Sequence, residues 1–218
     1  YEKGHLLSDI SNARLFDEFC KIFLNGMAEK NFNKLSSFGL SKYLISTDSE
    51  RSVFTRNLIV ESLRNTDKRL MNSQSITPGF LIAALLWPEL IGKSLSKGEI
   101  NLRKFFRSMD YVLRNQQKIT AVPRKFQSYI KDIWVLQLKL HSRIGKQPYK
   151  ILKHPRFRAA YDLLLIREKA ANEKHSLGKW WTEFQKNDEN LRKALIDDLK
   201  EKNMQESPKI FGFSEELR

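Results

Sequence analysis

The chain has 218 residues, of which 41% are hydrophobic, and this length is sufficient for the buried core of one large domain or two small ones. Its 39 Lys and Arg residues outnumber its 25 Asp and Glu residues, and the formal net charge of +14 indicates a polyanionic partner. The longest unbroken apolar run, residues 80–87, is much shorter than the roughly 20 residues that cross a bilayer, which excludes a membrane-spanning helix.

The cysteine content and the first residues bear on where the protein works. Cys20 is the only cysteine, so no internal disulfide can form and a reducing, cytoplasmic compartment is expected. The sequence begins at Tyr1 without Met and without an apolar leader. We therefore expect no secretory signal, and this start is compatible with a piece of a longer protein.

Apolar residues recur with the helical period of 3.6 along the chain, and no stretch alternates long enough to predict a strand. We therefore expect an all-α fold, an irregular array of many helices. Early helices are expected after caps at Asn12 and Asp48. Thr77 and Pro78 suit an N-cap and a first helical position, and the apolar residues after them point to every side, so this helix should be central. Further helices are predicted over about residues 100–117, from Pro123, near Pro148 and Pro155, and over 176–185 and 187–203, with 204–218 as a tail.

The positive charge is concentrated in the middle of the chain. Residues 118–169 contain 13 Lys or Arg against 3 Asp or Glu, whereas residues 1–117 contain 17 against 12. Such a localised excess is typical of an electrostatic binding surface. We therefore divide the chain into a helical part over 1–117, a basic binding region over 118–186, and a C-terminal helix and tail over 187–218.

Three lysines in the basic region have the spacing of one helix face. If residues 146–153 are helical, Lys146, Lys150 and Lys153 stand side by side at i, i+4 and i+7. Like charges at this spacing destabilise an isolated helix by roughly 0.2–0.5 kcal/mol per pair, and a bound phosphate would offset that cost. The surrounding sequence supplies no compensating acids, so phosphate contact is favoured over a merely solvated face.

The arginines that follow differ in the partners that the sequence offers them. Arg158 and Asp162 stand at i and i+4, so Arg158 either holds the fold through this ion pair or contacts a ligand. Arg156 has no such acid in its helix, and we expect it to line one continuous basic ridge with the three lysines. The full set of expected phosphate contacts is Arg124, Lys125, Arg143, Lys146, Lys150, Lys153, Arg156 and Arg158.

No constellation in the sequence predicts catalysis or a metal site. The four histidines lack metal-ligand spacing, and one cysteine cannot form a thiolate zinc cluster. Asp197 and Asp198 are adjacent on a predicted helix and point in different directions, and neither GxGxxG nor GxxxxGK[ST] occurs. The residues alone therefore indicate a binding region with no catalytic residue, metal or cofactor of its own.

Several long strings carry a family resemblance. They are "RKFQSYIKDIWVLQLKL", "RIGKQPYKILKHPRFRAAYDLLLIRE" and "LGKWWTEFQ", preceded in the same order by "NARLFDEF", "NTDKRL" and "TPGFLIAALLWPEL". From about residue 8 to residue 186, the chain resembles the C-terminal part of bacterial poly(A) polymerases. These are class II nucleotidyltransferases, a class that also contains the CCA-adding enzymes.

The resemblance implies both the fold and the ligand. It implies the helical neck and body of an enzyme that adds AMP from ATP to RNA 3′ ends. The α/β catalytic head, in which carboxylates hold two metal ions, is not in this sequence, so ATP and Mg²⁺ are expected to bind the head and this chain alone is expected to be inactive. The implied partners are that head and RNA, held by the phosphates behind its 3′ end without reading sequence.

Two other interpretations stay open on the sequence. The chain could be a helical scaffold whose basic face docks an acidic protein or the enzyme's own head. It could also be the body of a CCA-adding tRNA nucleotidyltransferase, although "HPRFRAAYDLL" fits the poly(A) polymerases better.

Overall fold

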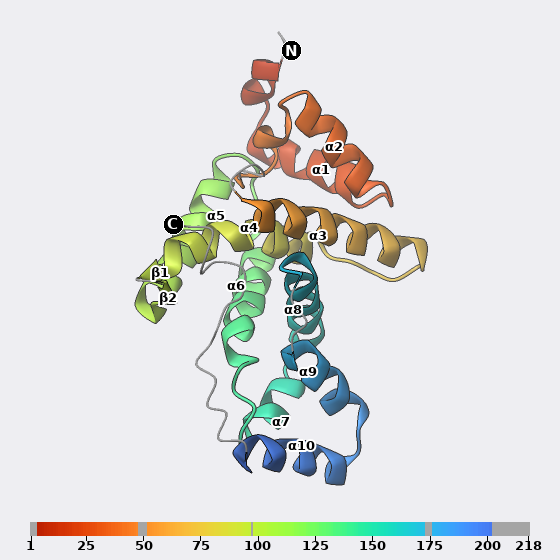
Figure 1. Cartoon of the computed structure of the whole chain (residues 1–218). Coiled ribbons are helices and arrows are strands. Elements are labelled where there is room, and N and C mark those ends of the chain that lie inside the picture. The colour runs from red at the N-terminus through yellow and green to blue at the C-terminus, as the bar shows by residue number, and fades with distance from the viewer. Residues whose placement is uncertain (1–3, 48–51, 97, 173–175, 202–218) are drawn as a thin grey trace.

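The computed structural model describes residues 4–47, 52–96, 98–172 and 176–201. In this part the chain is an elongated stack of helices, with α1 and α2 at one end and α7, α9 and α10 at the other (Figure 1). The α-helices are α1 (Asn12–Phe23), α2 (Ala28–Ser37), α3 (Val53–Met71), α4 (Pro78–Ser94), α5 (Leu102–Gln117), α6 (Arg124–Lys139), α7 (Gln147–Leu152), α8 (Phe157–Ala170), α9 (Ser176–Lys186) and α10 (Glu189–Glu201). Two 3-10 helices, η1 (Gly4–Asp9) and η2 (Ser41–Tyr43), and an antiparallel pair of two-residue strands, β1 (Leu95–Ser96) and β2 (Glu99–Ile100), complete the list. The expected all-α fold is confirmed.

The central helix α4 begins as the sequence predicts. The Thr77 hydroxyl accepts a hydrogen bond from the Phe80 backbone N–H (3.1 Å), and Pro78 takes the first helical position. Apolar residues on every side bury the helix from Gly79 to Pro88, and α3, α5 and α6 pack around it. Even so, none of the helices in the described ranges is both long and apolar enough to cross a membrane.

Two other predicted helix starts are displaced. α1 is capped by Ser11, whose hydroxyl accepts a hydrogen bond from the Arg14 backbone N–H (3.4 Å), one residue before the predicted cap at Asn12. α3 begins after Ser52, and the predicted cap at Asp48 lies outside the described residues. The shift at α1 is within the one or two residues by which helix ends commonly vary, whereas the cap of α3 lies four residues later than predicted.

Two hydrophobic clusters fill the interior. The first contains side chains from every helix from α1 through α6, together with Leu163 and Ile166 on one face of α8. The second joins the end of α6 to α7, α8, α9 and α10, and its Trp181 and Phe184 are fully buried. Because α6 and α8 contribute to both clusters, they connect the two ends of the molecule (Figure 1). The division after residues 117 and 186 stays a prediction.

Buried polar groups tie the helices around α8 together. Arg167 is 3% exposed, and its guanidinium donates to the side-chain oxygen of Gln137 (2.7 Å) and lies 4.5 Å from the centre of the Trp87 ring. The Gly178 backbone N–H donates to the carboxylate of Glu168 (2.8 Å), which joins α9 to α8. Buried charges persist in proteins when they are paired or hydrogen-bonded in this way, so α4, α6, α8 and α9 are held in fixed positions.

Candidate nucleic-acid interface

The three lysines with helical spacing lie on one exposed side of α7. Lys146 precedes this helix, Lys150 lies in it and Lys153 follows it, and all three are exposed, whereas Pro148 and Ile151 are buried. The three lysines, called the lysine row below, line a single groove. Within the described ranges, no acid forms an ion pair with the lysine row.

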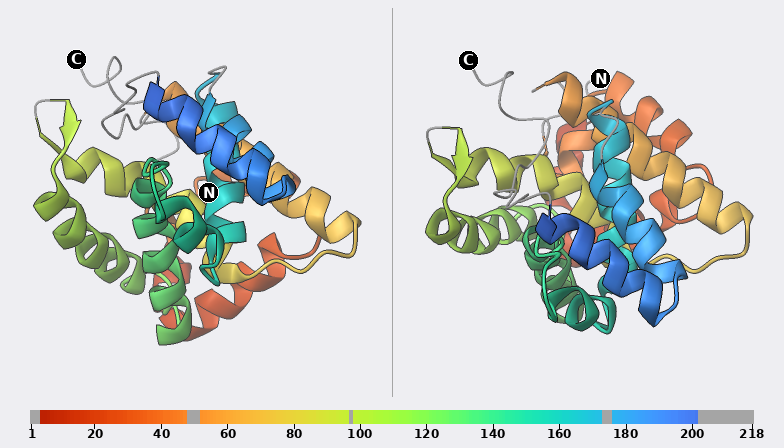
Figure 2. Two further views of the ribbon diagram at one scale, coloured as in Figure 1. Left: turned by 90° about the horizontal axis from the view of Figure 1, so that it is seen from below. Right: turned by 60° about the horizontal axis from the view of Figure 1, so that its bottom comes forward.

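Helix α10 forms the other wall of this groove, which has a volume of about 630 Å³ and is called the α7–α10 groove. Figure 2 looks at this end of the molecule, with α10 lying across it. The charged residues that α10 contributes are Glu189, Arg192, Lys193, Asp197 and Lys200. Together with the lysine row they place six bases and two acids around the groove, and one of the acids, Asp197, is paired with Lys200 (2.7 Å). The groove is therefore strongly positive.

The Arg192 guanidinium is held by hydrogen bonds within the chain. It donates from Nε to the carbonyl oxygen of Phe184 (2.8 Å) and from Nη2 to that of Gln185 (3.3 Å), at the C-terminal end of α9. A cation is favourable beside the carbonyls that end a helix, so Arg192 fixes the turn between α9 and α10. The other two α10 bases, Lys193 and Lys200, are exposed. Charge counting along the chain does not single them out, because acids and bases are nearly equal in number after residue 169.

Arg156 and Arg158 line a second, smaller groove of about 180 Å³ between α8, α6 and the segment before α4. The Arg158 guanidinium forms the predicted ion pair with Asp162 (3.0 Å), and the Arg156 guanidinium lies 4.7 Å from the centre of the Tyr129 ring. Arg69 of α3 also binds Asp162 (3.1 Å), a contact across 93 residues that the sequence did not reveal. We call this the arginine groove.

The expected basic ridge is therefore divided. The lysine row faces the α7–α10 groove, while Arg156 and Arg158 face the arginine groove. Only His154 and Pro155 separate Lys153 from Arg156 in the chain, so the two grooves are adjacent along the sequence. The expectation that the lysines and Arg156 line one continuous face is wrong in this detail, because α8 turns away after Pro155 and packs against α3.

Arg143 is a correction to the predicted site. Its side chain is buried, with 4% of its surface exposed, and its guanidinium lies 5.6 Å from the centre of the Trp180 ring. A buried guanidinium stacked on an indole contributes to packing and is not available to a ligand at the surface. The sequence reports the charge of Arg143 but not the direction of its side chain, which points inward from a loop whose neighbouring residues Ser142 and Ile144 are exposed.

Arg124 and Lys125 are exposed, but they lie apart from the lysine row. They occupy the first turn of α6, and the Lys125 ammonium group lies 5.0 Å from the centre of the Phe126 ring. Since α6 has 16 residues and rises about 1.5 Å per residue, a helix length of roughly 24 Å separates them from the end that leads to α7. Any contact that they make with a ligand is therefore a separate one.

The side chains that the structure describes do not form a catalytic metal site. In the described ranges, no three His, Cys, Asp or Glu residues come together in a group that could hold a metal ion. A site for adenylyl transfer with two metal ions needs such carboxylates. No step of that reaction can therefore be assigned to the residues described here.

Two family models match the sequence. Residues 97–210 match the model described as "Polymerase A arginine-rich C-terminus", and residues 2–47 match the one described as "Probable RNA and SrmB-binding site of polymerase A". The chain belongs to the poly(A) polymerase family. The first match includes α10, which the resemblance from the sequence did not reach, so both walls of the α7–α10 groove lie in the part of the family described as arginine-rich.

Curated members of the poly(A) polymerase family cover nearly all of this chain. It is 33% identical over 207 residues to poly(A) polymerase I of Salmonella typhimurium, 34% identical over 209 residues to that of Escherichia coli O6:H1, and 36% identical over 208 residues to that of Haemophilus influenzae. These matches cover 89% to 90% of this chain but only 44% to 46% of the relatives. The chain therefore spans less than half the length of these relatives.

Proposed function

We propose that this chain is the RNA-binding helical portion of a poly(A) polymerase, whose parent enzyme adds AMP from ATP to RNA 3′ ends. The observation that carries the proposal is the α7–α10 groove, where three lysines without acid partners among the described residues face a wall with further bases. The family descriptions support RNA as the polyanion, since one of them names RNA.

The lysine row binds the phosphates of RNA and does not read its sequence. An ammonium group is a point charge that contacts phosphate without distinguishing bases, so these contacts fix the position of the strand and not its sequence. Most of the binding free energy then comes from release of counterions, which makes the affinity strongly dependent on salt. The groove is open to solvent on the side of the lysines, as their exposure shows.

The chemistry of the enzyme belongs, in this proposal, to a separate catalytic head. ATP and Mg²⁺ bind there, and the chain alone is inactive because its described residues offer no carboxylate cluster for a metal ion. The head and the RNA 3′ end are accordingly the partners of this chain. A cytoplasmic location remains part of the proposal and is supported only by the single cysteine.

The test compares two variants with the same loss of charge. The first carries Lys146→Gln, Lys150→Gln and Lys153→Gln in the lysine row. The matched control carries Lys68→Gln, Lys179→Gln and Lys186→Gln, all exposed and outside both grooves. Fluorescence polarisation with labelled single-stranded RNA at low salt should show a large loss of affinity for the first variant and little loss for the control. Equal losses would mean that net charge alone, and not the groove, binds RNA.

A second function has one observation in its favour. The description of the family model that matches residues 2–47 names a protein, SrmB, beside RNA. Residues 2–47 line neither groove, so this description supports protein binding by the chain but not its place. The alternative is that the basic grooves dock an acidic protein or the catalytic head. It predicts that the lysine row variant keeps its affinity for RNA and loses binding to a separately expressed head. The CCA-adding alternative gains no support, since the relatives reported above are all named poly(A) polymerase I.

A further inference from the structure

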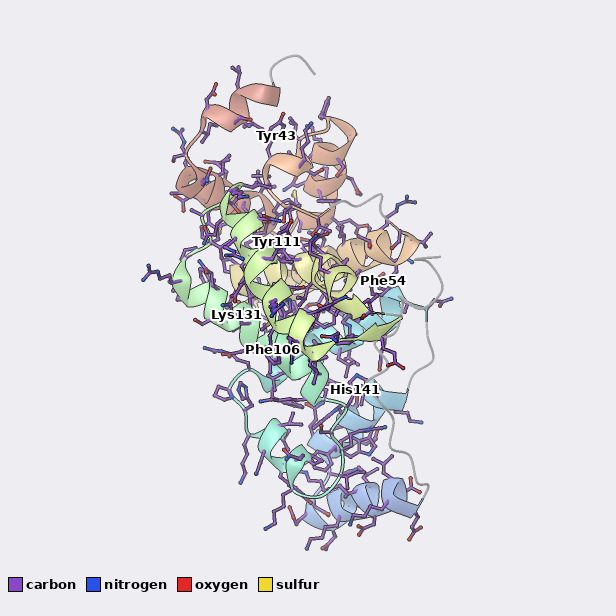
Figure 3. All side chains as sticks on the ribbon, turned by 90° about the vertical axis from the view of Figure 1, so that its left-hand side faces the viewer. Tyr43, Phe54, Phe106, Tyr111, Lys131 and His141 are labelled. Carbon is purple, nitrogen blue, oxygen red and sulfur yellow. The ribbon has the colours of Figure 1, made fainter. Side chains whose placement is uncertain are left out.

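Helix α5 has an exposed side that no other element of the described chain covers. Phe105, Met109 and Val112 bury one side of α5 against the core, while its opposite side faces solvent. Figure 3 looks onto this surface, on which Phe106, Tyr111 and the neighbouring Lys131 are labelled. The surface lies beside α4 in the middle of the stack, whereas the α7–α10 groove lies at its end (Figure 1).

The exposed side of α5 carries a row of bases. Arg103, Arg107, Arg114 and Lys118 are spaced by four, seven and four residues, which at 100° per residue places them within a sector of about 60°. We call these four residues the α5 ridge. All four are exposed, and no ion pair to them is found within the described ranges. The positive charge of the ridge is therefore left for a partner.

The one acid on α5 does not neutralise the ridge. Asp110 is paired instead with Lys131 of α6, whose Nζ lies 2.6 Å from the Asp110 carboxylate. Beside this pair, α5 and α6 enclose a hollow of about 760 Å³ whose wall includes Arg107 and Arg114. A hollow of this size is comparable with the pockets that hold small organic ligands.

Two aromatic rings flank the ridge. Phe106 is 49% exposed and Tyr111 is 43% exposed, and their positions on the helix place them on opposite sides of the four bases. The Phe106 ring is supported edge-on by Phe105, with ring centres 5.8 Å apart. Tyr111 is held by the ammonium group of Lys93, which lies 4.5 Å from the centre of its ring. Both rings are thus positioned by neighbours and yet remain accessible.

Exposed aromatic rings beside a row of bases match the chemistry of single-stranded nucleic acid. Phosphates pair with the cations, and unstacked bases lie on the rings, which binds any sequence because every base has a flat face. An acidic protein would satisfy the cations but would not need two separated flat rings. RNA is therefore the ligand that uses both features of this surface.

We propose that α5 carries a second RNA contact, in which Phe106 and Tyr111 stack on unpaired bases while the α5 ridge holds the phosphates. The proposal takes the identity of the ligand from the proposed function, but it uses none of the same residues. It also differs in mechanism, because the lysine row contacts only the backbone, whereas α5 needs bases. One strand long enough to reach both surfaces would be held at two points along the stack.

The experiment separates bases from backbone. Fluorescence polarisation of the 218-residue chain is measured with labelled oligoadenylate and with an abasic sugar-phosphate oligomer of the same length. The variant with Phe106→Ala and Tyr111→Ala should bind oligoadenylate at least about fivefold more weakly, the lower limit expected for one lost stacking contact. Its affinity for the abasic oligomer should not change. Arg107→Gln with Arg114→Gln should weaken the binding of both oligomers.

Two controls keep the result interpretable. Met71→Ala removes another large exposed apolar side chain, on α3, and should leave both affinities unchanged. Thermal unfolding followed by circular dichroism should show that the aromatic variant is fully folded at the temperature of the binding measurement, since only about half of each ring is buried. A 2-aminopurine base in the oligoadenylate should be quenched on binding the parent chain and less quenched with the aromatic variant.

The outcomes also distinguish this proposal from the proposed function. If the lysine row variant loses RNA affinity while the aromatic and arginine variants of α5 bind oligoadenylate like the parent chain, the second contact is overturned and the proposed function stands. If the α5 variants lose affinity for oligoadenylate while the lysine row variant does not, the second contact stands and the proposed role of the lysine row in binding RNA is wrong. Equal loss of oligoadenylate and abasic binding by the aromatic variant would overturn stacking.

Discussion

Arg69 of α3 and Asp162 of α8 form an ion pair of 3.1 Å, although 93 residues separate them in the chain. The same carboxylate binds Arg158 (3.0 Å). The pair therefore joins two long helices and also determines how much of the charge of Arg158 is left for a ligand. Three arginines with one carboxylate leave the arginine groove positive.

This geometry predicts an unusual dependence on pH. Burial raises the pKa of Asp162 above its ordinary value of 3.8, and the guanidinium groups of Arg158 and Arg69 only partly oppose that rise. A carboxyl group whose pKa is raised in the folded state stabilises the fold while it is protonated. This contribution is complete below pH 3.8, the ordinary pKa, and is lost as the pH rises through the pKa of the folded state. The free energy of unfolding of the parent chain minus that of Asp162→Asn should therefore fall over this window. Urea unfolding at several pH values measures it, and a difference that grew with pH would mean that the ion pairs outweigh burial.

His141 predicts the opposite trend. Burial, with help from the positive Arg167 and Arg143, lowers the pKa of His141 from 6.5 to about 4. A group whose pKa is lowered in the folded state contributes to the stability of the fold above pH 6.5, and this contribution is lost as the pH falls toward the pKa of the folded state. Relative to His141→Gln, the parent chain should lose on the order of 3 kcal/mol of unfolding free energy between these two pH values, at 1.36 kcal/mol per pKa unit. NMR titration of the His141 ring should show no protonation near pH 6, and a normal titration there would contradict the burial.

The close packing around Gly178 predicts that a side chain of one carbon at this position lowers the stability of the fold. A Cβ at this position would clash with the Glu168 carboxylate and lie 2.7 Å from Cδ2 of Leu165, between α8 and α9. Overpacking of this kind costs about 1–3 kcal/mol, so Gly178→Ala should lower the free energy of unfolding by that amount. Lys179→Ala, at the exposed neighbouring position, is the matched control and should change it by less than about 0.5 kcal/mol.

Arg143 and Lys146 should separate stability from binding. Arg143 is buried against Trp180, so Arg143→Gln should cost about 1–3 kcal/mol of unfolding free energy, and the folded fraction should bind RNA nearly normally. Lys146 is exposed in the α7–α10 groove, so Lys146→Gln should leave stability unchanged and weaken RNA binding. Chemical denaturation and fluorescence polarisation on the same two variants test both statements. A stable Arg143→Gln variant that bound RNA poorly would restore Arg143 to the binding site.

The fold could largely be predicted from the sequence because local rules decide it. The helical period marks almost every helix, and the Thr77 and Pro78 start of α4 and its apolar surface on all sides depend only on neighbouring residues. The pair of Arg158 and Asp162 is also local, with its partners four residues apart. Such features need no knowledge of the tertiary structure.

The binding surfaces could be predicted only in part, because the direction of a charged side chain depends on tertiary packing. Arg143 and Arg167 have the same residue type as Arg156, but the first two are buried and the third is exposed. Arg69 finds its carboxylate through the contact of α3 with α8, which no local spacing reveals. The α5 ridge could not be found by counting charge for another reason, since the boundary at residue 117 divides it: Arg103, Arg107 and Arg114 are diluted among the charges of residues 1–117, and Lys118 is counted with the next segment.

The most direct test of the central claim is the dependence of RNA affinity on salt. The slope of log Kobs against log salt concentration is measured for single-stranded RNA with the parent chain and with the triple Gln variant of the lysine row. Each phosphate contact contributes about 0.7 to this slope, so removing three lysine contacts should make it shallower by about 2. An unchanged slope in the lysine row variant would contradict the claim that these three lysines hold the RNA backbone.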